Sequence, residues 1–473
     1  MDPSRSEIDP RLLEDIRAGT CVAFVGAGFS AAAGLPAWPD LVRAVAQGLP
    51  PAERAEHRAT LDRLLEREPP GVHAQRELEM AAQLLFDAVG EERCRALLRD
   101  ALHPERLPER MQRRLKHLLG IPFRAIVTTN FDPLLPGVPP DAMAYRRLLR
   151  GVHPGPWRES VLRAALGIAV DPASPSLDSP DRPVVQLHGT LVHDASLVFT
   201  RSQYRRRLYA NPAYLTALKA LLATSTVLFL GYSMRDAYLN ELRAELIEAF
   251  QTSEAALRDP VGADPALALL RRPLAWAVLE DVSDVARVCY ERHEGLGVLA
   301  YRTGGDGEHA GFDDILAQIY DQTNPVHRLG QLLHGRRLLW VDPAPDDDAL
   351  GRRLLAEAVR EVEGSTRGLH RHVVTVTTCT DAIAKLRQSP TFDLVVARWR
   401  YDAGLRDGAD GEALLRAVAG LRAGGVPVPP VTIFAGAEHG PEERGRALQL
   451  GAIGFTSDWA RLMTAIEHVL ADT

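Results

Sequence analysis

The chain has 473 residues, of which 46% are hydrophobic and 25% are charged, and its formal net charge is −7. The length predicts two or three domains, and the apolar content is sufficient for large cores, which excludes a disordered or collagen-like chain. The negative charge argues against a general nucleic-acid binder, for which a basic surface is typical. The four cysteines lie far apart and form no Cys-x-x-Cys pair, so the sequence favours neither a disulfide framework nor a cysteine-ligated structural zinc.

The N-terminal stretch is acidic and polar, and it lacks the apolar region of a signal peptide. The longest apolar runs, such as 225–230 with its flanks, are much shorter than the roughly 18 residues that span a bilayer. We therefore expect a soluble, cytoplasmic protein that does not bind membranes.

Short apolar runs rich in Val, Ile, Leu and Phe alternate with helical patterns along the first two thirds of the chain. Such runs are typical of parallel strands that are buried on both faces. The predicted strands cover 21–25, 125–128, 184–187, 226–230, 276–279 and 297–301. A nearly all-helical insertion is predicted at about 41–119, and the Pro/Ser/Asp-rich stretch 171–183 predicts a surface loop.

The stretch 323–335 is predicted to be a linker, because it lacks strong periodicity and contains Asn324-Pro325 and Gly330. Strand patterns start again beyond it, at 338–341, 373–376, 394–397, 431–434 and 452–455, with helical patterns between them. They predict a second α/β unit of roughly 135 residues, which is enough for a five-stranded sheet.

A glycine-rich turn follows the first predicted strand. The strand ends in Gly26-Ala27-Gly28, and a helix-like run begins at Ser30. Glycines at such a turn let the backbone approach a ligand, and a helix N-terminus offers N–H donors to a pyrophosphate. No Gly-Lys-Ser/Thr follows, which disfavours a P-loop NTPase. A tight connection that binds nothing remains an alternative for this motif alone.

Three further predicted strands also end in polar residues or glycine. The residues concerned are Asn130 and Asp132 after the second strand, His188 and Gly189 after the third, and Gly231, Ser233 and Asp236 after the fourth. Ligands of an open parallel sheet bind outside the carboxyl ends of its strands. We therefore expect these groups to converge on one crevice.

Together and in this order, the four motifs resemble the sirtuin family, and more closely the bacterial sirtuin-like branch of antiphage defence proteins. The resemblance covers about 8–322 and implies a Rossmann-like NAD-binding domain of the α/β class. It implies that His188 is the catalytic base and that Asn130 and Asp132 hold the nicotinamide ribose and amide. The residues that it assigns to NAD binding are Gly26, Ala27, Gly28, Ser30, Thr129, Gly231, Ser233 and Asp236.

The sequence also departs from the sirtuin pattern. No cysteine stands between Cys94 and Cys289, so the four-cysteine zinc module of the protein deacylases is absent, and we expect no metal. Thr129 replaces the usual glutamine, and Ala37-Trp38 stands near the position of the usual Phe-Arg. These departures favour an enzyme that hydrolyses NAD itself. A zinc-free protein deacylase and a non-catalytic NAD or nucleotide sensor remain the alternatives.

The expected chemistry needs few groups. Cleavage of the nicotinamide–ribose bond develops oxocarbenium-like charge on the sugar, much as in glycoside hydrolysis. A neutral His188 accepts a proton from a ribose hydroxyl, Asn130 orients the sugar or a water, and Asp132 stabilises the positive charge.

The second unit, 336–473, resembles a flavodoxin-like receiver domain of a response regulator. Its phosphorylation machinery does not match, because Arg398 stands where the acceptor aspartate is expected and Phe434-Ala435-Gly436 lacks the switch Ser/Thr. Asp342 with Asp346 would form only an incomplete Mg²⁺ site. We interpret the unit as a degenerate receiver for sensing, docking or oligomerisation, with a plain structural role as the alternative.

An enzyme that empties the cytoplasm of NAD cannot be active all the time. We therefore expect an abortive-infection effector that is controlled through its C-terminal domain and assembles as a homo-oligomer. The activating partner would be a phage protein, a nucleotide signal or another defence protein, and no direct nucleic-acid binding is expected.

Overall fold

The computed structural model describes most of the chain. The described residues are 8–52, 54–55, 72–104, 106–135, 137, 183–191, 197–210, 212–234, 241, 244–245, 248, 273–303, 309–342, 349–363, 369–388, 392–399, 411–435, 441–457 and 459–472. The described residues form two compact units. The first contains the residues up to Leu118 and those from Phe123 to Ile319, and the second contains Leu119–Pro122 and the residues from Tyr320 onward.

The first unit is built on a sheet of six parallel strands in the order β3-β2-β1-β4-β5-β6, which is the Rossmann order. The strands are β1 (Cys21–Val25), β2 (Ala125–Thr128), β3 (Val184–Gln186), β4 (Thr226–Leu230), β5 (Ala275–Glu280) and β6 (Leu296–Tyr301). All six strands predicted from apolar runs are present, and the predicted α/β class with a Rossmann-like sheet is confirmed.

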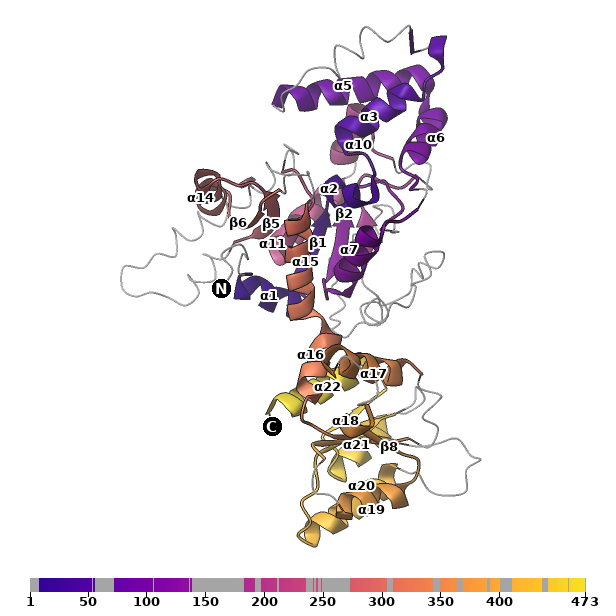
Figure 1. The fold of residues 1–473 in the computed structure, drawn as a ribbon, viewed down its shortest axis with the longest axis vertical. Helices are drawn as coiled ribbons and strands as arrows, with labels where there is room; N and C mark the ends of the chain where they lie inside the picture. The colour runs from indigo at the N-terminus through magenta and orange to yellow at the C-terminus, as the bar shows by residue number, and fades with distance from the viewer. Residues whose placement is uncertain are drawn as a thin grey trace, which may run out of the picture. The chain divides into compact units, whose positions relative to one another are not determined.

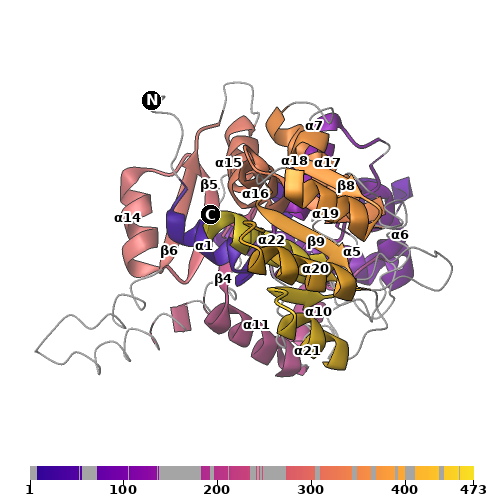
Figure 2. The same ribbon diagram turned by 90° about the horizontal axis from the view of Figure 1, so that it is seen from below.

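Helices cover both faces of this sheet (Figures 1 and 2). Val22 and Phe24 of β1 face a core that includes Leu218 and Leu221 of α11. The helices α7 and α15 lie on the opposite face in both views. Among the described residues, six helical elements belong to this unit besides the group in the next paragraph. They are α1 (Pro10–Arg17), α2 (Ala27–Ser30), the 3-10 turn η1 (Ala31–Ala33), α11 (Pro212–Thr224), α14 (Asp284–His293) and α15 (Ala310–Thr323).

A group of helices lies beyond the carboxyl ends of β1 and β2 (Figure 1). It comprises α3 (Trp38–Gln47), α5 (Val72–Val89), α6 (Glu91–Ala101) and α10 (Arg201–Ala210), while α7 (Glu109–Gly120) leads back to the sheet. Its core joins residues of α3, α5 and α6 to Phe131, Leu191 and Phe199, which follow β2 and β3. The described part of 41–119 is thus mainly helical, as predicted. None of the described helices is both long and apolar enough to cross a bilayer.

The second unit contains five parallel strands in the order β11-β10-β9-β7-β8, the doubly wound order of flavodoxin-like folds. The strands are β7 (Leu338–Val341), β8 (Val373–Val376), β9 (Leu394–Arg398), β10 (Val431–Phe434) and β11 (Gly454–Thr456). The helices are α16 (Pro325–Leu333), α17 (Ala349–Glu363), α18 (Leu369–His372), α19 (Cys379–Gln388), α20 (Gly411–Ala423), α21 (Pro441–Gln449) and α22 (Trp459–Asp472). A smaller α/β unit with a flavodoxin-like sheet is therefore present, as predicted.

The stretch predicted as a linker is largely helical. Asn324 caps α16 by accepting hydrogen bonds from the N–H groups of Val326 and His327, over 2.8 and 3.2 Å. Val326, Leu329 and Leu333 are buried in the core of the second sheet. Asn-Pro, taken from the sequence as a loop signal, starts this helix, because asparagine is a good N-cap and proline is favoured in the first turn.

Candidate functional site

Four strands of the first sheet end at the same level. The register pairs Val25 of β1 with Thr128 of β2 and with Leu230 of β4, and it pairs Thr128 with Gln186 of β3. The polar motifs that follow these strands therefore start from one row at the carboxyl edge. The connections diverge between β1 and β4, and such a switch point is where open α/β sheets bind ligands.

The turns after β1 and β4 touch each other. The Gly28 N–H donates to the Gly231 carbonyl over 2.9 Å, and a Cβ on Gly26 or Gly28 would lie within 2.7 or 2.9 Å of that same oxygen. Gly231 has φ +62°, and a Cβ there would lie 2.2 Å from the Phe29 nitrogen. The contact between the two turns thus requires all three glycines. The approach of a ligand, expected from the sequence for Gly26 and Gly28, stays a prediction.

This contact determines which backbone donors of the glycine turn are available. The N–H groups of Gly26 and Gly28 are used by the carbonyls of Leu230 and Gly231. The Ala27 N–H makes no hydrogen bond within the described residues, and Ala27 is half-buried. Of the two residues, Ala27 therefore has a backbone N–H that is available to a phosphate, and Gly28 does not.

A buried hydrogen-bond network joins the glycine turn to the end of β2. Asn130 Nδ2 donates to the Ser30 hydroxyl over 3.0 Å and to the Gly26 carbonyl over 3.2 Å. Ser30 Oγ in turn donates to Asp132 Oδ2 over 2.7 Å. Three predicted site residues that are up to 102 residues apart in the sequence are thus brought together. With Nδ2 engaged on both sides, the Asn130 side chain has a fixed orientation.

Asp132 is buried, at 4% exposure, and its carboxylate is engaged within the protein. Burial raises the pKa of the Asp132 carboxyl above its usual value, although the hydrogen bonds from Ser30 and from the Leu134 N–H act in the opposite direction. These contacts let the carboxylate hold Ser30, and through Ser30 the Asn130 amide. The role expected from the sequence, stabilising positive charge on a substrate, stays a prediction.

His188 lies next to this network, on the neighbouring strand end. It follows Gln186 by two residues, just as Asn130 follows the paired Thr128 by two. The imidazole is half-buried, with the rings of Phe131 and Tyr204 at 6.1 and 5.8 Å between centroids. Gly189 then turns the chain away with φ +81°. Histidine is the side chain that most often transfers protons near neutral pH, so the role of His188 as the base stays a prediction.

The other predicted residues lie in less informative surroundings. Thr129 is half-buried, and its N–H donates to the Val25 carbonyl over 3.3 Å. Ser233 is exposed beyond Gly231. Asp236, Asp346 and residues 171–182 of the loop predicted at 171–183 lie outside the described residues.

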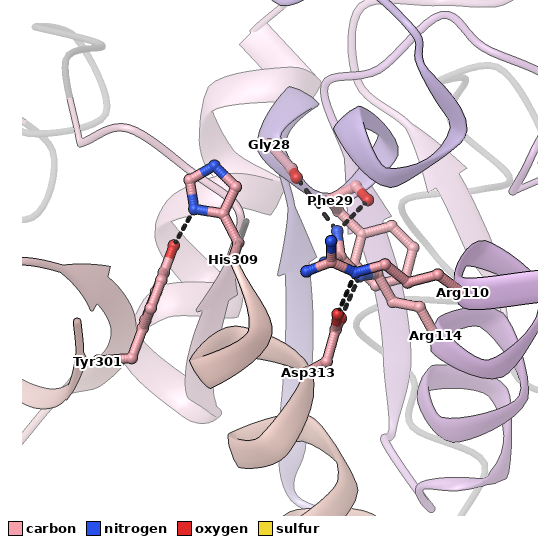
Figure 3. Close-up of polar contacts among 7 residues, drawn as sticks. All are labelled: Gly28, Phe29, Arg110, Arg114, Tyr301, His309 and Asp313. Carbon is pink, nitrogen blue, oxygen red and sulfur yellow. Dashed lines mark hydrogen bonds and ion pairs between the residues drawn. The ribbon is translucent and has the colours of Figure 1, made fainter. Parts of the chain in front are cut away.

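Arg114, which no sequence motif indicates, lies directly behind the glycine turn (Figure 3). This α7 side chain is buried, pairs with Asp313 of α15, and donates to the Phe29 carbonyl over 2.7 Å. Its partners are 199 and 85 residues away in the sequence, so no local pattern could have identified it.

In the second unit, Arg398 is the last residue of β9, and the resemblance to a receiver domain expects the phosphoacceptor at this position. Its Nε is 3.2 Å from Oδ2 of the fully buried Asp342, and its guanidinium lies 4.8 Å from the ring centre of Phe434. A permanent cation therefore neutralises the acidic residue at the end of β7. Within the described part of both units, no three His, Cys, Asp or Glu side chains are grouped so as to hold a metal ion.

Comparison with known proteins supports the sirtuin-like resemblance. Residues 124–281 match the family model of the SIR2-like domain, a stretch that includes Asn130, Asp132, His188 and Gly231. The chain is 25% identical over 241 residues to the NAD(+) hydrolase ThsA of Enterococcus faecium. That alignment covers 50% of this chain and 42% of the relative, so the chain spans less than half the length of that protein.

Proposed function

We propose that this chain, which contains a SIR2-like domain, is an NAD hydrolase that releases nicotinamide and ADP-ribose. The observation that carries the proposal is the row of four level strand ends at the switch point, with Asn130, His188 and the glycine turn along it. Dinucleotides bind at this point of Rossmann-like sheets. The name of the Enterococcus faecium relative supports the same substrate.

The reaction breaks the bond between the ribose C1′ and the pyridinium nitrogen, and a water oxygen takes the place of that nitrogen. Nicotinamide leaves as a neutral molecule, so no general acid is needed. His188 accepts a proton from a ribose hydroxyl as positive charge develops on the sugar. The attacking water gives one proton to that ribose oxygen as it bonds to C1′, and the proton on His188 is then released to solvent. Asn130, with its Nδ2 fixed by Ser30 and Gly26, presents its carbonyl oxygen to the sugar or to the attacking water. The Ala27 N–H is the backbone donor that the turn offers to a phosphate oxygen.

The second unit controls the enzyme in this proposal. Arg398 stands where the resemblance to a receiver domain expects the phosphoacceptor, and it pairs with Asp342, which argues against an aspartyl phosphate as the signal. Control must come from a ligand or partner that binds one state better than the other. We assign the protein to cytoplasmic antiphage defence by depletion of NAD, as a homo-oligomer that a phage protein, a nucleotide signal or a partner defence protein activates.

The test is to incubate the purified full chain with NAD and to follow nicotinamide and ADP-ribose, with and without an acylated peptide. We expect equal nicotinamide release in both reactions, with ADP-ribose as the second product. Release that depends strictly on the peptide, with transfer of the acyl group, would establish a deacylase. Binding of NAD without any cleavage, under all conditions that activate the protein, would establish a sensor.

A further inference from the structure

Arg114 connects three segments around the glycine turn. Its Nε donates to Asp313 Oδ1 on α15 over 2.7 Å, and its Nη1 donates to the Phe29 carbonyl over 2.7 Å, with a longer contact of 3.4 Å to the Gly28 carbonyl. Figure 3 shows the guanidinium group between the carboxylate and the two carbonyl oxygens. The side chain is only 3% exposed. A single residue of α7 thus ties α15 to the backbone of the turn.

The surroundings of Arg114 compensate for its burial. A buried guanidinium is unfavourable unless a carboxylate and other acceptors replace its water. Asp313 supplies the negative charge, and the rings of Phe312 and Phe29 lie 4.6 and 5.7 Å from Cζ, within the range of cation–π attraction. Burial raises the pKa of the nearby Tyr301 to about 12, so this phenol is neutral and adds no charge beside Arg114.

The turn needs such a partner because α2 has only four residues. The last carbonyl groups of a helix find no N–H donor within the helix, and basic side chains commonly donate hydrogen bonds to them. Arg114 does this for the Phe29 carbonyl, one residue before Ser30. Because Ser30 accepts from Asn130 and donates to Asp132, a displacement of Phe29 would be passed to the Asn130 amide.

We propose that Arg114 is a positioning residue of the NAD site: it holds the turn after β1 so that the Ala27 N–H and the Asn130 amide meet the substrate. The inference rests on the proposed function, since it names a residue for that same site. Arg114 does not touch the substrate in this role. It acts through the Phe29 carbonyl and Ser30.

Arg110 provides a matched control on the same helix. It precedes Arg114 by one turn, and its Nε donates to Asp313 Oδ2 over 2.5 Å. Among the residues drawn in Figure 3, the Gly28 and Phe29 carbonyls accept from Arg114 and not from Arg110. Replacing either arginine by methionine removes one ion pair to Asp313 and leaves the other. Only the Arg114 replacement releases the turn.

The experiment compares Arg114→Met with Arg110→Met in the full chain. Equilibrium binding of NAD is measured with each variant combined with His188→Ala, which prevents turnover, and KM and kcat are measured without it. We expect Arg114→Met to raise both Kd and KM by about 10-fold or more, because a displaced turn would weaken the hydrogen bonds that the Ala27 N–H and the Asn130 amide make to the bound dinucleotide. Arg110→Met should change either constant by no more than about two-fold. The melting temperature should fall in both variants, because each loses an ion pair to Asp313.

Two further variants keep the test decisive if Arg114→Met does not fold. Arg114→Lys keeps the charge but not the planar fork, so it should weaken NAD binding in the same direction. Asp313→Asn keeps an acceptor for the Arg114 Nε and should have a smaller effect. Equal changes in Kd for the two arginine variants, or a lower melting temperature without any change in Kd, would leave Arg114 with a structural role only. A wild-type protein that neither binds nor cleaves NAD would overturn the proposed function together with this inference.

Discussion

Ser30 joins two strand ends through one hydroxyl group. It accepts from Asn130 on one side and donates to Asp132 on the other, and all three side chains are buried. A hydroxyl can do both at once, whereas alanine can do neither. The position of the Asn130 amide therefore depends on a residue 100 positions away in the sequence, and on a carboxylate that burial makes harder to ionise.

His188→Ala is expected to abolish NAD cleavage while the protein stays folded. The imidazole is half-buried at a strand end, so its loss leaves no large cavity in the sheet core. Removal of a general base typically costs about 10²–10⁴ in rate. Nicotinamide release and the melting temperature are measured together, and wild-type turnover by the variant would remove His188 from the mechanism.

Asp132→Asn is expected to make the protein more stable and less active. Because burial raises the folded pKa of Asp132 above the ordinary 3.8, the folded state binds this proton more tightly than the unfolded chain does. Its contribution to stability is therefore greatest at low pH and is lost as the pH rises from 3.8 through the raised pKa. The variant has no such titration.

The measurement is the melting temperature of both proteins from acid to neutral pH. The difference, variant minus wild type, should increase as the pH rises, while NAD cleavage falls because the amide disturbs Ser30 and Asn130. A difference that is constant with pH would show that Asp132 does not titrate in this range.

At the scale of elements, the contact between the turns after β1 and β4 provides a matched pair of glycines. Gly231 and Gly34 have similar φ angles, +62° and +75°, but a Cβ would collide with the Phe29 nitrogen at Gly231 and would meet nothing within 4 Å at Gly34. Both alanine variants carry the cost of a left-handed residue, about 1–2 kcal/mol. Only Gly231→Ala must also separate the two turns.

We expect Gly34→Ala to retain NAD binding and cleavage and Gly231→Ala to lose both. Binding by titration, cleavage by nicotinamide release, and melting temperature are the readouts. Equal NAD binding by the two variants would show that the contact between the turns does not shape the site.

The strands were predictable because parallel strands that are buried on both faces are short continuous apolar runs. The edges were less certain: β11 begins two residues later than predicted, and it is only half-buried. The sequence predicts a linker in place of helix α16, because Asn324-Pro325 is a common loop signal, although the buried Val326, Leu329 and Leu333 follow helical spacing. At the site, Asn130, Asp132 and Ser30 were identified from motifs, but their mutual hydrogen bonds and Arg114 depend on long-range packing that no local pattern encodes.

At the scale of the whole molecule, the position of α16 defines how the second unit should be removed. A chain that ends after Gly335 keeps α16 without the sheet that buries Val326, Leu329 and Leu333. A chain that ends after Asn324 carries no such apolar face. We expect the chain that ends after Gly335 to aggregate and the chain that ends after Asn324 to stay dispersed. The particle mass of the chain that ends after Asn324, and its rate of NAD hydrolysis, should differ substantially from those of the full chain.

Mass by light scattering and nicotinamide release are compared for the three proteins. Unchanged kinetics and an unchanged number of subunits after truncation at Asn324 would contradict control by the second unit. Stimulation of the full chain by acetyl phosphate with Mg²⁺ would contradict the interpretation of Arg398 as a permanent replacement for the phosphoacceptor.

The pairing of β1 with β4 also has a consequence during protein synthesis. The two strands are about 200 residues apart in the sequence, and β1 lies in the middle of the sheet. Pairs so distant must wait for the ribosome to release the later strand, since the entropy of closing the loop is recovered only when both partners are present. The two turns that form the proposed site cannot meet before residue 231 has emerged. In the proposed function, a nascent chain would thus be unable to cleave cellular NAD until most of the first unit has been synthesised.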